Sequence, residues 1–560
     1  LLMLKGASQV LDEIWGVVVS DVMERTCDRV DQVLLSDGGG HRGASQVCYC
    51  AGCAEKNPVD YQRIRSLLRS KSDKSYIGLD DCSCMTARSH AMQETACSTV
   101  CCCPMTWILL VLHLLVVVGL GLRILWRTDL RPDVRMGWLV TVVLLPVISC
   151  VLYFLFGEVA LRRGGRARHR KVRDYMLRHM QTPMPNAQTV QQEMLHTIDR
   201  PWHSAFGYAA SINGFLPSKG HSAELMADGA TARARMLQDM DAAQHEIHVL
   251  YYIWLDDETG RNIAQALIRA AQRGVKCRAM VDGLGSRALV HSPLWKAMEA
   301  AGVEVAVALP LSHPIRVLLT SRIDLRNHRK ITIIDRQITY CGSQNCADEA
   351  FLPKARFAPW VDIMLRVQGP VVAQMQWVFA SDWNQSEAQP FPPPEPPPLP
   401  CAEDSGFAAV VIAEGPTERA RSTSQLMLQL LACAQQEVVI STPYFVPDAT
   451  VLDALCAAAW RGVTVRMIFP ARNDSAFVAA ASRSYYQRLL TAGVQIHEFT
   501  PGLLHAKTLC VDGQVTLLGS TNLDLRSFDL NLKTTSCCRT RPSRPPCASA
   551  RMTTWHSRTP

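Results

Sequence analysis

Two short segments of this 560-residue chain repeat one pattern of charged and polar residues. HRKITIID and HAKTLCVD each read His-x-Lys, then four further residues, then Asp. The residues concerned are His328, Lys330 and Asp335 in the first segment, and His505, Lys507 and Asp512 in the second. Alternating β-branched residues after each lysine indicate strands. Residues two apart on a strand point to the same face, so each segment is predicted to present an imidazole and an ammonium group side by side.

Two histidines and two lysines that converge on one site suit phosphoryl transfer. Lysine ammonium groups neutralise the non-bridging oxygens of a phosphate. One imidazole can attack phosphorus and form a covalent intermediate. The other can protonate the leaving alcohol and then deprotonate the incoming one. If each half of the chain supplies half of the site, the pattern has to occur twice.

A Gly-Ser-x-Asn turn follows each segment at a similar distance. We expect its small polar side chains to bind phosphate close to the same sheet edge. These residues are Ser343, Asn345, Ser520 and Asn522. A single His-x-Lys segment would be interpreted as an ordinary polar stretch, but two copies with matching turns favour a site. The aspartates either hydrogen-bond within it or close a strand–turn junction, and we expect them to give structural support.

The elements that would position these residues are also duplicated. From residue 219 onward, the order strand, helix, Arg-Gly-Val, strand occurs twice. The first copy comprises residues 246–254, 263–271, 273–275 and 276–283, and the second comprises 437–445, 452–460, 461–463 and 464–470. Strands that alternate with helices predict an α/β architecture with a largely buried sheet.

Two apolar segments precede the duplication, at residues 107–126 and 136–157. Each has about 20 residues, enough for a helix to cross the hydrocarbon core, and tryptophans stand near their ends. A signal peptide is disfavoured for the first, because a second segment follows and no small-residue cleavage site does. Basic residues between 162 and 173 predict that the C-terminal part is cytoplasmic. The same cluster either binds anionic headgroups or serves only as a topology signal.

Length and composition complete the predicted organisation. A chain of 560 residues with net charge +8 is expected to form two or more units and fits an anionic partner as well as ordinary solubility. Ten of the 21 cysteines precede residue 104, without the spacing of a zinc site. The predicted segments are an irregular extension not native to the family and translated from upstream of Met105 (1–104), a transmembrane hairpin (105–163), a basic connector (164–218), a first half (219–388), a Pro-rich linker (389–404), a second half (405–535) and an irregular tail (536–560).

The paired segments resemble the HKD motifs of the phospholipase D superfamily, and the chain is more closely similar to bacterial cardiolipin synthases. The resemblance covers about residues 105–533. The segments that carry it are YFLFGE, YYIW, NHRKITIID, WVDIMLRVQGPVVAQMQWVFASDW, STPYFVPD and LLHAKTLCVDGQVTLLGSTNLDLRSFDLN. It implies two phospholipase D-like α/β halves, with mixed sheets flanked by helices, that share one active site. A two-helix transmembrane hairpin in the bacterial inner membrane would precede these halves in the sequence.

The resemblance also implies an activity, namely a phosphatidyl transfer that needs neither metal nor cofactor. One phosphatidylglycerol would transfer its phosphatidyl group to a histidine and release glycerol, and a second would then attack to give cardiolipin. In this family the first-motif histidine, here His328, is usually the nucleophile, and His505 would be the acid and base. The near-symmetry of the motifs leaves the reverse assignment open. The implied partners are phosphatidylglycerol and anionic membrane lipid, without nucleic acid.

The chain departs from the family pattern near its C-terminus. Lys533 stands where Asn-x-Glu would place an acid that orients a catalytic histidine through its second ring nitrogen. Asp362 fills the equivalent place in the first half. The Arg-, Pro-, Cys- and Thr-rich tail suggests a change of reading frame near residue 533, and loss of a strand would expose a sheet edge. An inactive membrane-bound homologue is therefore an alternative. A hydrolytic membrane phospholipase D is another, because it would use the same residues with water as the acceptor.

Overall fold

The computed structural model describes residues 103–127, 130–153, 157, 171–172, 174–175, 198–310, 325–386, 391, 406–415, 419, 421–529 and 531–539. The chain divides after Pro104 into two units. All described residues belong to the second unit except Cys103 and Pro104, which begin the helix Cys103–Leu125. The cysteine-rich extension with its disfavoured zinc site, most of the basic connector, the Pro-rich linker apart from Phe391, and the tail from residue 540 lie outside the described residues.

Fourteen strands of the described chain form one mixed sheet, in the order β13-β12-β10-β15-β16-β18-β9-β1-β8-β6-β5-β2-β3-β4. The strands of the first half are β1 (Ser218–Leu225), β2 (Glu246–Tyr251), β3 (Lys276–Asp282), β4 (Glu304–Ala308), β5 (Lys330–Ile334), β6 (Ile338–Gly342) and β8 (Met364–Gln368). Those of the second half are β9 (Phe407–Glu414), β10 (Glu437–Ser441), β12 (Thr464–Pro470), β13 (Gln495–Phe499), β15 (Thr508–Val511), β16 (Val515–Gly519) and β18 (Lys533–Arg539).

The two halves have the same strand order when each is read from the sheet edge inward. In the first half β2, β3 and β4 are parallel neighbours, and in the second half β10, β12 and β13 are. The remaining neighbours in the sheet are antiparallel, including the matching hairpins β5–β6 and β15–β16. The predicted duplicated α/β fold with mixed strands is therefore confirmed.

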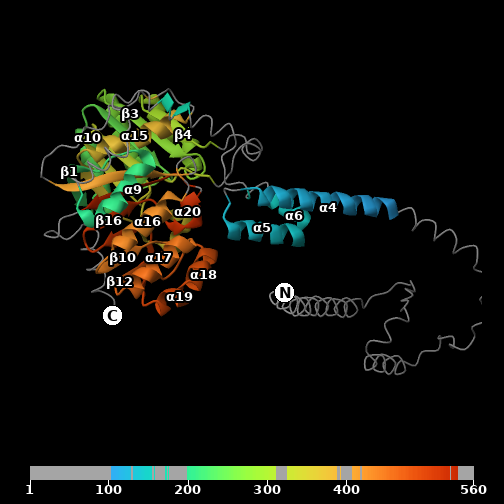
Figure 1. Cartoon of the computed structure of the whole chain (residues 1–560). Helices are drawn as coiled ribbons and strands as arrows, with labels where there is room; N and C mark the ends of the chain where they lie inside the picture. The colour runs from blue at the N-terminus through green and yellow to red at the C-terminus, as the bar shows by residue number, and fades with distance from the viewer. Residues whose placement is uncertain are drawn as a thin grey trace, which may run out of the picture. The chain divides into compact units, whose positions relative to one another are not determined.

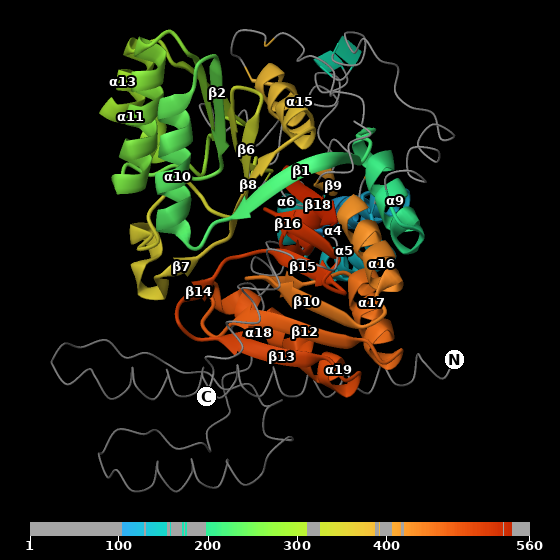
Figure 2. The same cartoon turned by 90° about the vertical axis from the view of Figure 1, so that its left-hand side faces the viewer.

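The sheets of the two halves are joined rather than separate, which the sequence did not reveal. Strands β1 and β9 pair antiparallel, with a register irregularity between Ser218 and His221 (Figure 2). His221 fastens the junction from inside: its Nδ1–H donates to the Phe407 carbonyl at 2.9 Å, and its Nε2 accepts the Val371 N–H at 3.0 Å. Pairing removes two sheet edges that would otherwise expose unpaired backbone groups.

Helices flank both halves, as Figure 1 shows for the described part of the chain. The first half contains α10 (Gly229–Ala242), α11 (Glu258–Gln272), α12 (Arg287–Val290), α13 (Pro293–Ala300), the 3-10 helix η4 (Leu352–Phe357) and α15 (Val371–Asn384). The second contains α16 (Ser422–Cys433), α17 (Ala449–Trp460), α18 (Ala476–Ser484), α19 (Tyr486–Thr491) and α20 (Leu525–Asp529). Four two-residue strands, β7 (Trp360–Val361), β11 (Phe445–Val446), β14 (Leu503–Leu504) and β17 (Leu523–Asp524), form two small sheets.

The duplicated sequence segments fold alike because their helix ends use the same chemistry. Helix α11 begins after Asp257, whose carboxylate accepts the Gly260 N–H, and α17 begins after Asp448, which accepts the Val451 N–H. Each helix ends in the repeated Arg-Gly-Val, whose glycines have left-handed φ angles of +89° at Gly274 and +90° at Gly462. A residue with a side chain rarely adopts that conformation, so glycine terminates both helices.

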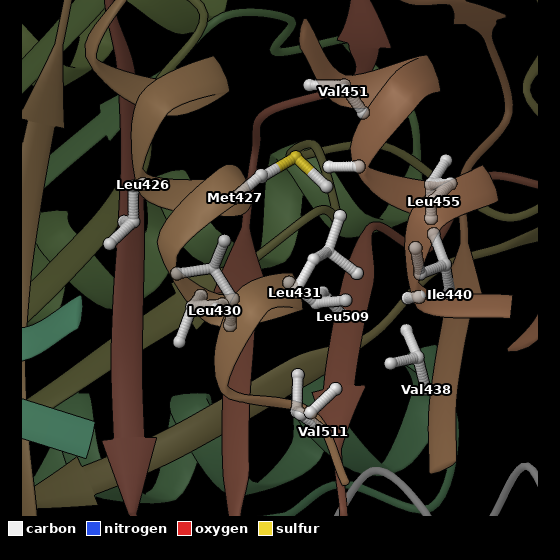
Figure 3. Close-up of a cluster of buried hydrophobic side chains, with 14 of the residues drawn as sticks. Leu426, Met427, Leu430, Leu431, Val438, Ile440, Val451, Leu455, Leu509 and Val511 are labelled. Carbon is white, nitrogen blue, oxygen red and sulfur yellow. The ribbon is translucent and has the colours of Figure 1, made fainter. Parts of the chain in front are cut away.

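The three largest apolar clusters of the described residues lie in the two halves. Figure 3 shows one of them, in which side chains of α16 and α17 pack onto β10 and β15. A second lies among α10, α11, α13 and the first-half strands. The third lies under α15 and draws on both halves, since it contains Val378 together with Val411 and Leu518. A shared core of this kind fixes the halves relative to each other.

The structure corrects two of the predicted segment boundaries. The end of the predicted connector forms η3 (Arg200–Trp202) and α9 (His203–Asn213), which packs on the second half. Residues 536–539, which we expected to begin an irregular tail, belong to β18. That strand pairs with β16 on one side and β9 on the other, so no sheet edge is exposed there. Its threonines and cysteines are small enough to be buried on both faces.

The predicted hairpin segment forms three helices, α4 (Cys103–Leu125), α5 (Pro132–Leu144) and α6 (Pro146–Leu152). The second apolar segment is therefore broken rather than continuous. The break falls at Leu145, which has φ −133° and ψ 60°, because a proline at position 146 has no N–H to continue the helical hydrogen bonds. Across the described residues, none of the helices combines the length and apolarity that a membrane span requires.

Candidate active site

The two motif histidines lie at the junction of the halves, and each is held by the backbone of the opposite half. The His328 N–H donates to the Leu532 carbonyl at 2.9 Å, and the His505 N–H donates to the Val361 carbonyl at 2.8 Å. A bridge between Asn327 and Leu532 and the β14–β7 pair carry these contacts. The structure therefore brings both motifs to one place.

Each motif lysine folds back on its own histidine. Lys330 Nζ lies 3.1 Å from His328 Nδ1 and donates to the His328 carbonyl at 3.0 Å. Lys507 Nζ donates to the His505 carbonyl. Both strands begin at or just after the lysine, so the histidines precede the strands rather than lying on them. In the first motif, the imidazole and the lysine side chain nevertheless lie side by side, as predicted.

An aromatic ring covers each imidazole. Tyr252 stacks on His328 with ring centroids 4.1 Å apart, and Trp360 lies against His505 at 4.7 Å. The Lys330 ammonium group also lies 5.3 Å from the centre of the Tyr252 ring. These rings exclude water from one side of each imidazole. The sequence alone did not indicate that either residue belongs to the site. Tyr252 lies in YYIW and Trp360 begins WVDIMLRVQGPVVAQMQWVFASDW, two of the segments that carry the family resemblance.

A carboxylate of the first half holds the histidine of the second half. Asp362 Oδ1 accepts hydrogen bonds from His505 Nδ1 at 2.6 Å and from the Ser343 hydroxyl at 2.5 Å. Burial raises the pKa of Asp362, but His505 and Lys507 outweigh it and keep that pKa at about 2. Asp362 therefore stays ionised and occupies the orienting position that the sequence resemblance implied.

Lys533 occupies the matching position of the second half. Asp362 stands two residues before Met364, which pairs with Gly342. Lys533 stands two residues before Thr535, which pairs with Gly519 in the equivalent hairpin. The Lys533 side chain is fully buried, and its Nζ donates to the Ser520 carbonyl at 2.9 Å. An ammonium group thus replaces a carboxylate beside the His328 half of the site.

The motif aspartates, which complete the two repeated patterns, lie at the far ends of their strands from the histidines. Asp335 accepts the backbone N–H groups of residues 244, 245 and 246 at 2.7–2.9 Å. Asp512 accepts those of residues 435, 436 and 437 at 2.8–2.9 Å. Both aspartates have left-handed φ angles in the turn. They bind the chain where it enters β2 and β10, which is the strand–turn role considered above.

The predicted phosphate-binding residues are buried beside the motifs but are largely occupied by structural contacts. Ser343 donates to Asp362, and Ser520 accepts the Thr534 N–H at 3.2 Å. The Asn345 side-chain oxygen accepts the Ile253 N–H at 3.3 Å. The Asn522 side-chain oxygen has no protein partner among the described residues. Of the four, only Asn522 therefore has a buried polar oxygen for which the described residues provide no partner.

The site gathers several buried basic side chains around the two motifs. Burial lowers the pKa of Lys507 and Lys533 to about 7, partly opposed by Asp362 at Lys507 and by Asp524 at Lys533. Burial and then Lys330, Lys533 and Lys507 lower the pKa of His328 well below its usual value. Each of the buried lysines thus lowers the tendency of its neighbours to stay protonated, and a bound anion would favour their charged forms.

Next to Asp362 lies an open cavity of about 450 Å³. Trp360 and Phe351 form aromatic parts of its lining, and Gln344, Asn345 and Glu349 contribute polar groups. The first turn of α10 also reaches it at Gly229, where a Cβ atom would come within 2.2 Å of Glu349 Oε1. The cavity therefore adjoins the His505 side of the site and can hold a small polar group.

A buried ion pair anchors the first motif from behind. Arg329, which stands between His328 and Lys330, pairs with Asp382 of α15. Its guanidinium also donates to the Lys533 carbonyl at 3.0 Å and to the Glu414 carbonyl at 3.3 Å. Arg329 thus connects the first motif to the second half. Sequence reasoning missed this residue because its partners, Asp382 and the Lys533 carbonyl, are 53 and 204 positions away in the chain.

Comparisons with known proteins show what this chain is similar to. The family profile described as "Cardiolipin synthase, PLD-like domain" matches residues 236–383 and 427–544. Cardiolipin synthase A of Serratia proteamaculans is 36% identical over 433 residues, which cover 77% of this chain and 88% of the relative. Cardiolipin synthase A of Erwinia tasmaniensis is 36% identical over 442 residues, with the same two coverages.

Among solved structures, the phosphatidylserine synthase of Haemophilus influenzae is similar over 64% of this chain and 90% of its own, with 13% identity and a TM-score of 0.46. The phospholipase D family member Nuc of Salmonella typhimurium is similar over 27% of this chain and 93% of its own, with 20% identity and a TM-score of 0.23. The identity to the curated relatives over most of both chains decides the assignment. This chain belongs to the cardiolipin synthase family of phospholipase D-like proteins.

Proposed function

We propose that the protein is a phosphatidyltransferase that makes cardiolipin and glycerol from two molecules of phosphatidylglycerol through a phosphohistidine intermediate. The observation that carries this proposal is the meeting of the two His-x-Lys motifs at the junction of the halves, with Asp362 of one half on His505 of the other. A phosphodiester anion matches the three buried lysines, because it supplies the negative charge that the site lacks.

The cavity beside Asp362 suits the glycerol headgroup. It adjoins His505 through Trp360, and its polar side chains, such as Gln344 and Asn345, can hydrogen-bond hydroxyl groups. Aromatic rings in the lining can contact the carbon-bound hydrogens of a polyol. A hydroxyl bound here would be a competitor for water as the acceptor, which favours transfer over hydrolysis.

We propose further that the site opens toward a membrane of anionic lipid. Leu352 of η4 and Phe477 of α18 are 75% and 83% exposed. Lys354 joins these two segments, because its Nζ donates to Asp474 at 2.5 Å. Asp474 in turn raises the pKa of Lys507, so this rim lies beside the site. Exposed apolar side chains at this rim fit contact with a lipid interface.

The transmembrane hairpin and a cytoplasmic orientation in the bacterial inner membrane stay proposals of the same kind. Their support is the exposed aliphatic side chains of α4 and α5, for example Leu115 and Val143, and the basic residues that follow in the sequence.

The test is a product analysis of the purified full chain with labelled phosphatidylglycerol in detergent micelles. We expect cardiolipin and glycerol in equal amounts. Phosphatidic acid as the main product would identify a hydrolase, and absence of turnover would contradict the proposal. His328→Ala and His505→Ala should each abolish cardiolipin formation. His291→Ala, which changes an exposed histidine of the first half, is the matched control and should leave the rate unchanged.

A further inference from the structure

The hydrogen bond between His505 and Asp362 fixes which nitrogen of His505 can react. An ionised carboxylate only accepts hydrogen bonds, so the proton of the neutral ring lies on Nδ1, 2.6 Å from Asp362 Oδ1. The Nε2 atom then keeps its lone pair. This is the arrangement of a nucleophilic imidazole, because the carboxylate also stabilises the positive charge that the ring acquires when Nε2 bonds to phosphorus.

His328 is held in the opposite way. Its Nδ1 lies 3.1 Å from Lys330 Nζ. When a bound phosphodiester keeps Lys330 protonated, that ammonium group can only donate. Nδ1 is therefore an acceptor, and the proton of the neutral ring lies on Nε2. The matched position that could supply a second carboxylate holds Lys533 instead. A lone pair on His328 Nε2 would require Nδ1 to carry the proton toward the Lys330 ammonium group.

Charge reinforces this difference. Attack by His328 would place a positive charge on a ring that Lys330, Lys533 and Lys507 already surround. Burial and the other two lysines lower the pKa of Lys330, which makes its ammonium group a ready proton donor. A bound phosphodiester returns one negative charge to the site, so that Lys330 enters the reaction protonated.

We propose that His505 is the nucleophile in this chain and that Lys330, acting through His328, protonates the leaving alcohol. This assignment is the reverse of the one implied by the family resemblance. It rests on the proposed function, because it assigns roles within the same site, and it goes beyond that function by deciding between two nearly symmetric histidines.

The steps balance in protons and charge. His505 Nε2 bonds to phosphorus, and the bond between phosphorus and the glycerol oxygen breaks. That oxygen takes the proton from His328 Nε2 while Lys330 gives one proton to His328 Nδ1, leaving Lys330 neutral. In the second step the acceptor hydroxyl gives its proton to His328 Nε2, the Nδ1 proton returns to Lys330, and the new oxygen–phosphorus bond replaces the bond to His505.

A substrate with an activated leaving group separates the two roles. p-Nitrophenolate leaves without a proton donor, so phosphatidyl-p-nitrophenol needs the nucleophile alone for the first step. We expect His328→Ala to release the first equivalent of p-nitrophenol within about 10-fold of the wild-type rate, while its turnover of phosphatidylglycerol falls by about 100-fold or more. His505→Ala should lose both reactions. The reverse pattern would overturn the assignment.

The site of the covalent adduct gives an independent readout. After rapid quenching of His328→Ala with the activated substrate, peptide mass spectrometry should find the phosphatidyl group on His505, because the second step also needs His328. In the wild-type protein the transient adduct should lie on the same residue. An adduct on His328 of the wild-type protein would overturn the proposal. If an alanine variant unfolds, the corresponding glutamine variant retains a polar side chain and serves instead.

The outcomes distinguish this proposal from the function on which it rests. Wild-type protein that gives phosphatidic acid with the adduct on His505 would contradict the synthase function and support the roles. Cardiolipin formation with the adduct on His328 would support the synthase function and contradict the assigned roles. Wild-type protein that releases no p-nitrophenol and forms no adduct would overturn both.

Discussion

Asp362 and Lys533 occupy matching positions in the two halves, each two residues before the residue that pairs with the glycine of the Gly-Ser-x-Asn turn. Asp362 binds the ring of His505, and Lys533 binds the Ser520 carbonyl. One position thus holds an acidic side chain and the equivalent position holds a basic one. This single difference makes two otherwise similar half-sites chemically unequal.

Restoring the second carboxylate should improve the enzyme. In Lys533→Glu the loss of an ammonium group and the gain of a carboxylate both raise the pKa of His328, so that its ring carries a proton more often at neutral pH. We expect cardiolipin formation at pH 7 to rise by roughly 10-fold, measured as the initial rate in micelles. Lys533→Gln removes the charge without adding an acid and should fall in between. A glutamate variant no faster than the glutamine variant would contradict this expectation.

Removing the buried charge should stabilise the protein in a pH-dependent way. Burial lowers the pKa of Lys533 to about 7, although Asp524 and Glu414 oppose the shift. Below that pH the lysine is protonated in both states, and its burial penalty is complete. Between pH 7 and about 10.4, the ordinary lysine value, the folded protein releases the proton while the unfolded chain keeps it, so the penalty declines.

Lys533→Met should therefore raise the free energy of unfolding most at pH 6–7, by on the order of 2–4 kcal/mol, and by little near pH 10. Urea unfolding at several pH values measures the difference. A stabilisation that grows with pH would contradict the assigned pKa shift.

The motif aspartates should affect folding rather than chemistry. Asp335→Ala leaves three backbone N–H groups without their acceptor and should lower the free energy of unfolding by about 2–3 kcal/mol. Turnover per folded molecule should stay within about 3-fold, since the carboxylate lies at the far end of β5. Asp362→Asn provides the contrast, because it should reduce turnover by about 100-fold with a smaller loss of stability. Loss of turnover in a stably folded Asp335→Ala protein would assign that residue to the site.

The Arg329–Asp382 pair should show strong coupling. Arg329→Met leaves a buried carboxylate without its partner and should cost about 3–5 kcal/mol of stability. The double variant Arg329→Met/Asp382→Leu removes both charges and should recover most of that loss. A double-mutant cycle based on urea unfolding measures the coupling free energy. Additive effects of the two substitutions would show that the pair does not act as a unit.

The exposed rim should matter for membranes and not for dispersed substrate. Leu352→Asp/Phe477→Asp should weaken binding to anionic vesicles by roughly 10-fold or more, because two apolar side chains no longer enter the lipid. Turnover of a short-chain, micelle-free substrate should be unchanged. Trp460→Asp is the control: this residue is 69% exposed and ends α17 shortly before Thr464, which pairs with Glu437 at the Asp512 end of β10. Equal loss of binding in the control would argue against a localised rim.

Local patterns were sufficient for much of the fold and the candidate site. The repeated strand–helix–glycine order predicted the duplicated halves, since helix caps and glycine turns are encoded within a few residues. The His-x-Lys spacing identified the residues that meet, and the family resemblance indicated Asp362. Asp335 and Asp512 show the limit of such patterns. They belong to the motifs in sequence, but their hydrogen bonds are to the backbone that leads into β2 and β10, which the motif does not contain.

Long-range pairing could not be inferred from the same patterns. Strand β18 reads KTTSCCR, which has no alternation of polar and apolar residues, and it is buried only because β16 and β9 supply partners on both sides. The β1–β9 junction joins two segments that are far apart in sequence and is formed in part by polar residues such as Ser218 and His221. Arg329 likewise depends on Asp382 and on carbonyl groups of the other half.

The continuous sheet across β1 and β9 has a consequence for how such an enzyme can diversify. In an assembly of two identical subunits, every substitution would change both halves together, and losing an acid would remove it twice. Because both halves here are parts of one polypeptide, positions 362 and 533 can differ, and the two imidazoles can specialise without abandoning a common substrate. The covalent link between the copies thus permits a division of labour that a symmetric dimer could not adopt.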